Sequence, residues 1–468
     1  MVPPPDASKD DNASVATRFL DRSSSSGILL GLLCIEGLGI KICQITLTVL
    51  LCGYFLMAND WIQLLWFTLT CPIAFLFAPW SRVWPSIQRD RFLRFAGYFL
   101  VWMTVSSFLA QTINTSIGAR EAVAWLFGTA LLVAFALLVW HSARDLSALQ
   151  HTGWWIGMGA ALAALISMLM FYVILPGHVF GERLCNWFVY GGLNPVATGL
   201  TFGFASMWLT CARNAMQSRN ERLLASIAIV ILIFAVFFTR SRGAVLALIA
   251  GHAALIAIYG LRANRTPVAI FVAIALTFQI SGPLVAMLST KQVASRVSVQ
   301  SSEESLATGA TIIAYSNPAR ELINRGDNGR FELYRSAFAS LQGPRQWLFG
   351  IGQWSTEHLW KPCTGWNPEH LHSAFLATLV HGGLVGFSML LVVFSIGSYR
   401  AYQLAKAGQG TWLVLLACGS AGMLFDGQTF STFTSIPRME VLLVIFPLIV
   451  SASAYHHLIN AKQASVKS

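Results

Sequence analysis

Long apolar runs separated by short polar segments dominate the chain. Four of these runs reach the roughly 18–20 residues that a helix needs to cross the hydrocarbon core of a membrane: Phe92–Ala110, Ala122–Trp140, Trp154–Leu175 and Val268–Leu288. Counting the shorter runs, we expect spans at residues 27–57, 61–79, 92–112, 121–141, 153–175, 195–212, 222–239, 243–261, 266–289, 371–397, 411–426 and 438–456. The pattern predicts an all-α polytopic membrane protein with about twelve transmembrane helices.

The first of these runs is ambiguous. It is too long for one upright helix and too short for two helices with a turn, and Glu36 and Lys41 interrupt it. We expect an interfacial stretch that leads into one helix. Residues 1–26 before it are polar and Ser-rich without an apolar core, so they predict a disordered cytoplasmic tail rather than a signal peptide.

The distribution of lysine and arginine predicts the orientation. With the N-terminus in the cytoplasm, the inside segments hold Lys9, Arg18, Arg22, Arg82, Arg89, Arg91, Arg94, Arg144, Arg213, Arg219, Arg222, Arg262, Arg265, Arg400, Lys406, Lys462 and Lys467. The short outside loops hold Arg120, Arg183, Arg240, Arg242 and Arg438. Because positive charge favours the cytoplasmic side, both termini are expected there.

This orientation divides the chain into five parts. The tail 1–26 precedes nine transmembrane helices in 27–289, and a large outside loop occupies 290–370. The last three helices lie in 371–456, and 457–468 forms a second cytoplasmic tail. A loop of this length is unusual unless it has helices and a function of its own, so we expect the active site to involve it.

Composition supports this reading. The chain is 55% hydrophobic and 11% charged, whereas a soluble domain carries about 25% charged residues. Its net charge of +11 does not indicate nucleic-acid binding, because the basic residues mostly sit at the ends of apolar segments. Membrane lipids are therefore the expected environment, and nucleic acid is not an expected partner.

The long loop contains a predicted amphipathic helix at Asn328–Gln342. Phe331, Tyr334, Phe338 and Leu341 recur in it at near-helical spacing. Gly343 and Pro344 end this helix, and an apolar turn follows at residues 348–352.

Arg240 and Arg242 lie in a tight turn on the outer face, on the side disfavoured for positive charge. A charge at membrane depth commonly lines a polar cavity, and the planar guanidinium suits a diphosphate. The alternative is that both side chains extend to lipid head groups at a helix end.

His372 opens the span that follows the long loop. In the first turn of a helix, the positive end of the helix dipole favours a neutral imidazole, which is the form that a general base requires. Alternatively, His372 hydrogen-bonds across the bundle or caps the helix.

A metal site is not expected. His372 and His381 are about 14 Å apart along a helix, and His370 and His372 would point to different helix faces. The sequence also lacks HExxH, Walker A and dinucleotide-binding motifs, so no cofactor is expected.

Cys185 and Cys363 are the two cysteines on the predicted outer face. Because that compartment is oxidising, we expect that they can pair, although the sequence does not give their separation.

Three motifs, in this order, resemble the O-antigen ligase and polymerase superfamily. Thr239–Ala244 is similar to the SRG turn of that superfamily, and Asn328–Tyr334 with the later Gly350-Ile351-Gly352 is similar to its periplasmic-loop helix and G-x-G end. His372-Ser373 with Gly383 and Gly386 matches the ligase signature H-[NSQ]-x9-G-x-x-G. Asn194 lies in a polar turn, Gly192–Pro195, that resembles the start of an earlier span.

The resemblance implies a metal-independent glycosyltransferase fold of the GT-C type, with one large periplasmic loop. It implies a multi-pass protein of the bacterial inner membrane whose active site faces the periplasm. The implied donor is a glycan on undecaprenyl diphosphate, and the implied acceptor is lipid A–core. Arg242 and Arg330 would bind the diphosphate and His372 would activate the acceptor hydroxyl.

Further substrate-binding candidates are Arg240 and Arg183, placed by topology, together with Tyr334 and Asn194. Two alternatives to the ligase remain from the same superfamily, an O-antigen polymerase and a protein O-oligosaccharyltransferase. A transporter is a third alternative, but such proteins commonly show repeated halves, which this sequence does not.

Overall fold

The structure is a computed structural model that describes residues 25–56, 60–70, 84–85, 88–114, 119–174, 182–189, 194–280, 329–353, 370–433 and 439–467. Within these ranges the regular structure is helical and contains no strand. The helices are α2 (Ser25–Leu56), α3 (Asp60–Thr70), α6 (Arg91–Asn114), α7 (Ala119–Ser142), α8 (Leu146–Leu169), η1 (Met170–Ile174), α9 (Pro195–Ala215), α10 (Arg219–Phe238), α11 (Arg242–Tyr259), α15 (Arg330–Ala339), α16 (Pro344–Phe349), α18 (Ala374–Lys406), α19 (Thr411–Phe425), η2 (Val441–Ile445) and α20 (Phe446–Lys467).

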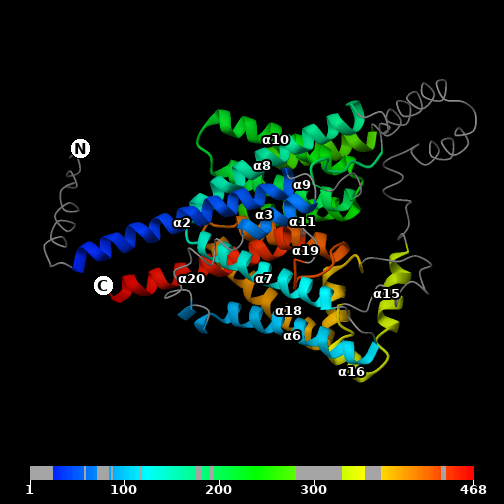
Figure 1. Ribbon diagram of the computed structural model, residues 1–468. Coiled ribbons are helices and arrows are strands. Elements are labelled where there is room, and N and C mark those ends of the chain that lie inside the picture. The colour runs from blue at the N-terminus through cyan, green and yellow to red at the C-terminus, as the bar shows by residue number, and fades with distance from the viewer. Residues whose placement is uncertain are drawn as a thin grey trace, which may run out of the picture.

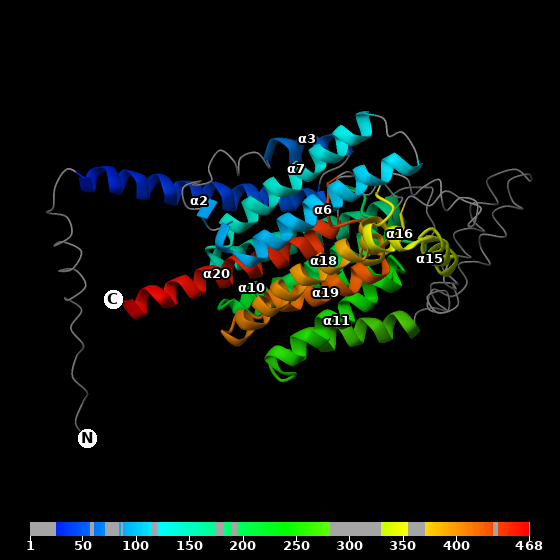
Figure 2. The same ribbon diagram turned by 90° about the horizontal axis from the view of Figure 1, so that it is seen from below.

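The long helices run side by side in one bundle (Figures 1 and 2). The beginning of α2 and the end of α20 lie at one end of the bundle, which we call the termini end. The short helices α15 and α16 lie at the opposite end, which we call the loop end.

The bundle has the composition of a multi-pass membrane protein. Seven described helices are long and apolar enough to cross a membrane: Arg91–Ala110, Val123–Ser142, Leu146–Ile174, Arg219–Phe238, Arg242–Tyr259, Ala374–Lys406 and Val441–Asn460. Three shorter apolar helices accompany them, at Lys41–Leu56, Arg265–Ile280 and Thr411–Phe425. The all-helical architecture is confirmed for the described residues, while the count of about twelve spans stays a prediction.

The central helix of the bundle is α9, whose residues from Ala197 to Ala212 are all buried. Its Trp208 packs against Trp412 of α19 and Phe446 of α20, with ring centroids 6.1 and 5.2 Å apart. Large rings at these positions fill the space between three helices and hold α19 and α20 against the centre.

The first helix corrects one sequence prediction. Residues 25–56 form a single helix of 32 residues, which Glu36 and Lys41 do not interrupt. Such a helix is about 48 Å long, so it extends well beyond a core of about 30 Å. Glutamate and lysine favour helix and can lie outside the hydrocarbon, which explains why the helix continues. Similarly, α20 continues to Lys467 through the predicted tail 457–468.

The predicted loop helix is present as α15, but its buried face differs from the prediction. Leu333, Ala337 and Leu341 are 0%, 0% and 4% exposed, whereas Phe331 is 74% and Phe338 40% exposed. The aliphatic stripe packs against Leu371, which precedes α18, and against Ala377 and Val380 within that helix. Close packing on another helix favours these smaller side chains, so the phenylalanines point away from the bundle.

Candidate active site

Two glycines attach the loop segment to α18. Gly350 (φ 81°) and Gly383 (φ 65°) both have a left-handed backbone, and Gly383 makes a kink inside α18. A Cβ on Gly350 would collide with the carbonyl oxygen of His381, and one on Gly383 with that of Leu348. The N–H groups of Ile351 and Gly352 donate to the carbonyls of Val380 and His381, both at 3.0 Å. The G-x-G and G-x-x-G motifs are therefore two sides of one contact.

Helix α6 braces the same kink. The Nε1 of Trp102 donates to the carbonyl of Gly382 at 2.8 Å, and the Oγ of Ser106 donates to the carbonyl of His381 at 2.7 Å. A kink releases carbonyl groups from the helical ladder, and buried carbonyls need a donor. This fixed kink holds the loop segment close to the start of α18.

His372 lies just before α18 and is paired with Asp426. The Nδ1 of His372 is 3.2 Å from Oδ1 of Asp426, which directly follows α19. The Asp426 side chain is 3% exposed and that of His372 is 29% exposed. Burial raises the pKa of Asp426, but the hydrogen bond from His372 and the charges of His370 and His372 outweigh it, so the pKa lies below its ordinary value.

The position of His372 differs from the prediction. The helix begins at Ala374 with Ser373 as its N-cap, so His372 is not in the first turn. Its backbone is left-handed instead, with φ 52°. The positive end of the helix dipole therefore does not act on His372 as predicted, and the nearest charged group is Asp426.

Backbone strain marks two of the predicted site residues. Arg240 (φ 51°) and His372 (φ 52°) are the non-glycine residues with positive φ in the described part of the chain. Such a conformation costs on the order of 1–3 kcal/mol and tends to occur at functional sites. Both residues are among those selected from the sequence, and their functional role stays a prediction.

Arg330 and Tyr334 reach the His372–Asp426 pair from α15. The Nη1 of Arg330 donates to the carbonyl of Phe425 at 2.6 Å, one residue before Asp426. The Tyr334 hydroxyl donates to the carbonyl of His372 at 3.4 Å. Burial raises the pKa of Tyr334, the charge of Arg330 lowers it and that of Asp426 raises it, with a net rise. Tyr334 therefore stays a neutral donor.

The turn that contains Arg242 packs against the same point. Ser241 caps α11 by accepting from the N–H of Ala244 at 3.3 Å, and Arg242 is exposed in the first turn. A Cβ on Gly243 would lie 3.5 Å from the Cβ of Phe425. All three sequence motifs thus meet at the segment Phe425–Asp426.

Arg240 and Arg183 lie together at the turn between α10 and α11. Arg240 is only 5% exposed. The Nε of Arg183 donates to the carbonyl of Thr239 at 3.0 Å, and the N–H of Leu184 donates to that of Phe238 at the same distance. These contacts hold residues 182–189 against the end of α10.

Asn194 has a structural position. Its side chain caps α9 by accepting from the N–H of Ala197 at 3.0 Å, and Pro195 follows at the first helical position. The capping bond occupies the side-chain oxygen, and a substrate-binding role for Asn194 stays a prediction.

Sequence reasoning missed Asp426 and Glu440. Glu440 is 2% exposed, and its Oε1 accepts from the N–H groups of Gln428 and Thr429. It therefore orders the chain that directly follows Asp426. The available signal for Asp426 was its position as an acidic residue at the end of the apolar run 411–425, because ionisable residues next to membrane spans are costly and often functional.

His370 and His372 lie closer together than the sequence predicted. His370, His372 and Asp426 each place one ligand atom within 4.8 Å of the others, so these residues could hold an ion. The two imidazoles have ring centroids 4.2 Å apart. They do not point to different helix faces, because both residues precede α18.

Cys185 is a buried free thiol whose Sγ lies 3.8 Å from the carbonyl oxygen of Arg183. Cys363 lies outside the described residues, so its pairing with Cys185 stays a prediction.

Comparison with known proteins supports the resemblance seen in the sequence. The model of a family described as O-antigen ligase matches residues 227–391. This range includes the Arg240–Arg242 turn, Arg330 and His372, and it confirms the resemblance to the O-antigen ligase superfamily for that part of the chain. No curated protein matches the chain.

Proposed function

We propose that this chain, whose residues 227–391 match the O-antigen ligase family, is an O-antigen ligase. In this proposal it transfers a glycan from undecaprenyl diphosphate to a sugar hydroxyl of lipid A–core. The reaction takes place in the periplasmic leaflet of the bacterial inner membrane and on a GT-C-type fold. The observation that carries the proposal is the meeting of the three family motifs at Phe425–Asp426.

The proposed base is Nε2 of His372. The lowered pKa of Asp426 keeps this carboxylate ionised, so it can only accept a hydrogen bond. The nitrogen facing it, Nδ1, must then carry the proton, which leaves Nε2 with a free lone pair. Asp426 is thus a positioning residue that fixes the tautomer and stabilises the imidazolium formed later.

In the proposed reaction, the acceptor hydroxyl loses its proton to Nε2 of His372. Its oxygen forms a bond to the anomeric carbon of the glycan, while the bond from that carbon to the diphosphate oxygen breaks. The electron pair leaves with undecaprenyl diphosphate, which gains negative charge. A base of this kind contributes about 10²–10⁴ in rate.

Arg242 and Arg330 are the proposed diphosphate ligands. A guanidinium fixed near the leaving group stabilises charge that grows in the transition state, which accelerates the step more than it strengthens ground-state binding. The hydrogen bond from Arg330 to the carbonyl of Phe425 fixes the direction of that side chain. Two permanent cations supply the role that a magnesium ion plays elsewhere, so we propose that the reaction is metal-independent.

Arg183 is proposed to extend the positive charge toward the donor, with the buried Arg240 behind it. Tyr334 is proposed to hold the His372 turn through its backbone. Asn194 is proposed to contribute from the start of α9 through its amide nitrogen, since its side-chain oxygen accepts the capping bond.

The test is the lipopolysaccharide of a strain that lacks this chain. A ligase predicts lipid A–core without O-antigen, together with full-length polymer accumulated on undecaprenyl diphosphate. Core capped with a single repeat unit would identify an O-antigen polymerase and contradict the proposal. Normal lipopolysaccharide with a lost protein glycan would identify a protein O-oligosaccharyltransferase, and unchanged glycans of both kinds would favour a transporter.

A further inference from the structure

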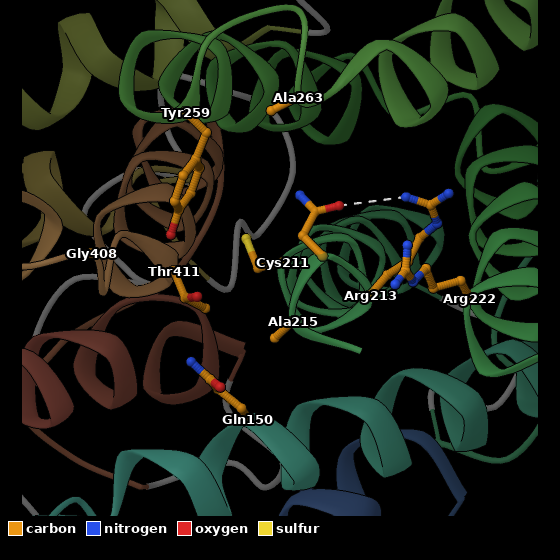
Figure 3. Close-up of a pocket in the computed structure, with 10 residues that line it drawn as sticks. Gln150, Cys211, Arg213, Ala215, Arg222, Tyr259, Ala263, Gly408 and Thr411 are labelled. Atoms are coloured by element: carbon orange, nitrogen blue, oxygen red, sulfur yellow. Dashed lines mark hydrogen bonds between the residues drawn. The ribbon is translucent and has the colours of Figure 1, made fainter. Parts of the chain in front are cut away.

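A polar cavity, drawn in Figure 3, lies where α8 and α10 begin and α9 and α11 end, at the termini end of the bundle. Its volume is about 460 Å³. The ends of α8, α9, α10 and α11 and the turn between α18 and α19 surround it, and its polar lining comprises Gln150, Arg213, Asn214, Arg222, Tyr259 and Thr411. Cavities of about 300–1,000 Å³ suit small ligands.

The charged side chains that line this cavity are both positive. Arg213 from α9 and Arg222 from α10 lie side by side on one wall, facing Gln150, Tyr259 and Thr411 across the opening (Figure 3). Within the described part of the chain no acidic residue lines the cavity, and neither arginine is in an ion pair. Two adjacent guanidinium groups repel each other unless an anion lies between them.

Local hydrogen bonds orient both guanidinium groups without using all their donors. Arg213 donates to the Oγ of Ser226 at 2.8 Å and to Oδ1 of Asn214 at 3.4 Å. Arg222 donates to the carbonyls of Met216 and Gln217 at 2.8 and 3.1 Å. A guanidinium has five N–H donors, so with two used on each arginine, three remain on each for a ligand.

We infer that this cavity binds a phosphate group, with Arg213 and Arg222 as its ligands. The planar guanidinium binds phosphate oxygens in a bidentate way, which suits this pair better than a halide or a neutral ligand. The phosphate can belong to an anionic lipid head group at the membrane surface or to a soluble phosphate ester. The inference does not depend on the proposed glycosyl transfer.

The experiment measures binding to the purified full chain in neutral detergent. The probes are dihexanoyl phosphatidylglycerol, a lipid phosphate, and glycerol 3-phosphate, a soluble one. The variants are Arg213→Gln and Arg222→Gln. Arg219→Gln is the matched control, because Arg219 is an exposed arginine of α10, the helix of Arg222, but does not line the cavity.

We expect Arg213→Gln and Arg222→Gln each to weaken binding by roughly tenfold to a hundredfold, the effect of losing charge-assisted hydrogen bonds. Arg219→Gln should bind as the natural chain does. Binding of both probes supports recognition of the phosphate itself, and binding of phosphatidylglycerol alone assigns the site to a lipid. The inference is overturned if neither probe binds, or if Arg213→Gln and Arg222→Gln bind as tightly as Arg219→Gln.

Discussion

Two buried aspartates lie at opposite ends of the bundle, and each has a histidine beside it. At the termini end, Asp90 is 4% exposed and accepts from Nη1 of Arg400 at 2.9 Å and from Nδ1 of His456 at 3.0 Å. At the loop end, Asp426 is 2% exposed. Among the described residues its ion-pair partner is His372, with the two side-chain atoms 3.2 Å apart.

The difference lies in the counter-charge. Asp90 also accepts from the N–H of Phe92 at 2.8 Å, so it caps α6 while Arg400 supplies a permanent positive charge from α18. Burial raises the pKa of Asp90, but the hydrogen bonds from His456 and Arg400 outweigh it and lower the pKa. Asp426 faces an imidazole that can gain and lose a proton. The first arrangement stabilises a fold, and the second is suited to proton transfer.

Substituting His372 at the loop end and His456 at the termini end should give the largest difference in transfer rate between the two sites. We expect His372→Ala to lower the rate of glycan transfer by about 10²–10⁴ while the protein still inserts at its normal level. His456→Ala is the matched control and should keep its rate per folded molecule. The measurement is transfer from a lipid-diphosphate-linked glycan by purified protein, and a full rate for His372→Ala would exclude His372 as the base.

Changing the arginines at the loop end should have the next largest effect. Arg330→Lys and Arg242→Lys are each expected to lower the transfer rate by about 10²–10³, because an ammonium cannot reproduce the bidentate geometry. Arg330→Ala and Arg242→Ala should lose at least as much.

Arg335→Lys is the matched control for these variants, since Arg335 is an exposed arginine of α15. Wild-type rates for Arg330→Lys and Arg242→Lys, measured in the same assay, would show that simple positive charge suffices.

At the termini end, Arg400→Gln should reduce stability and leave the chemistry intact. Removing one partner of a buried ion pair costs about 3–5 kcal/mol of unfolding free energy. Because the pKa of Asp90 is lowered from 3.8, its stabilising contribution is present above that pH and is lost as the pH falls through the lowered value. The unfolding free energy of Arg400→Gln should therefore fall less with decreasing pH than that of the natural chain. An equal pH dependence would contradict this role for Arg400.

Removal of divalent metal should have the smallest effect. We expect EDTA to leave the transfer rate unchanged, because the arginines carry the charge compensation. Loss of activity on chelation that Mg²⁺ or Mn²⁺ restores would contradict the arginine mechanism. Loss that Zn²⁺ restores would instead indicate that His370, His372 and Asp426 hold a functional ion.

The sequence predicted features that depend on local pattern. Apolar runs gave the membrane helices, and α15 appeared where near-helical spacing placed it. Arg242 and His372 stood out as ionisable residues at the ends of apolar runs, and Arg330 was identified through the resemblance of the loop motif Asn328–Tyr334. Each of these inferences needs only a window of neighbouring residues.

The features that the sequence did not predict depend on tertiary contacts. Asp426 is 54 residues from His372, so their pairing follows from how α19 packs beside α18. The left-handed turn at His372 and the buried face of α15 also depend on tertiary packing, which the spacing of hydrophobic residues does not reveal. Glu440 acts through the backbone of Gln428 and Thr429, a contact that leaves no motif.

The most direct test of the account compares Asp426→Asn with Asp90→Asn, measuring transfer rate and unfolding on the same samples. Asparagine keeps the shape of the side chain but removes its charge, so it no longer fixes the tautomer of the histidine. We expect Asp426→Asn to lower the rate per folded molecule by about 10–100-fold, as lost orienting partners of functional histidines do. Asp90→Asn should lower stability with the rate unchanged. Equal rates for the two variants, or a slower Asp90→Asn, would contradict the assignment of catalysis to the loop end.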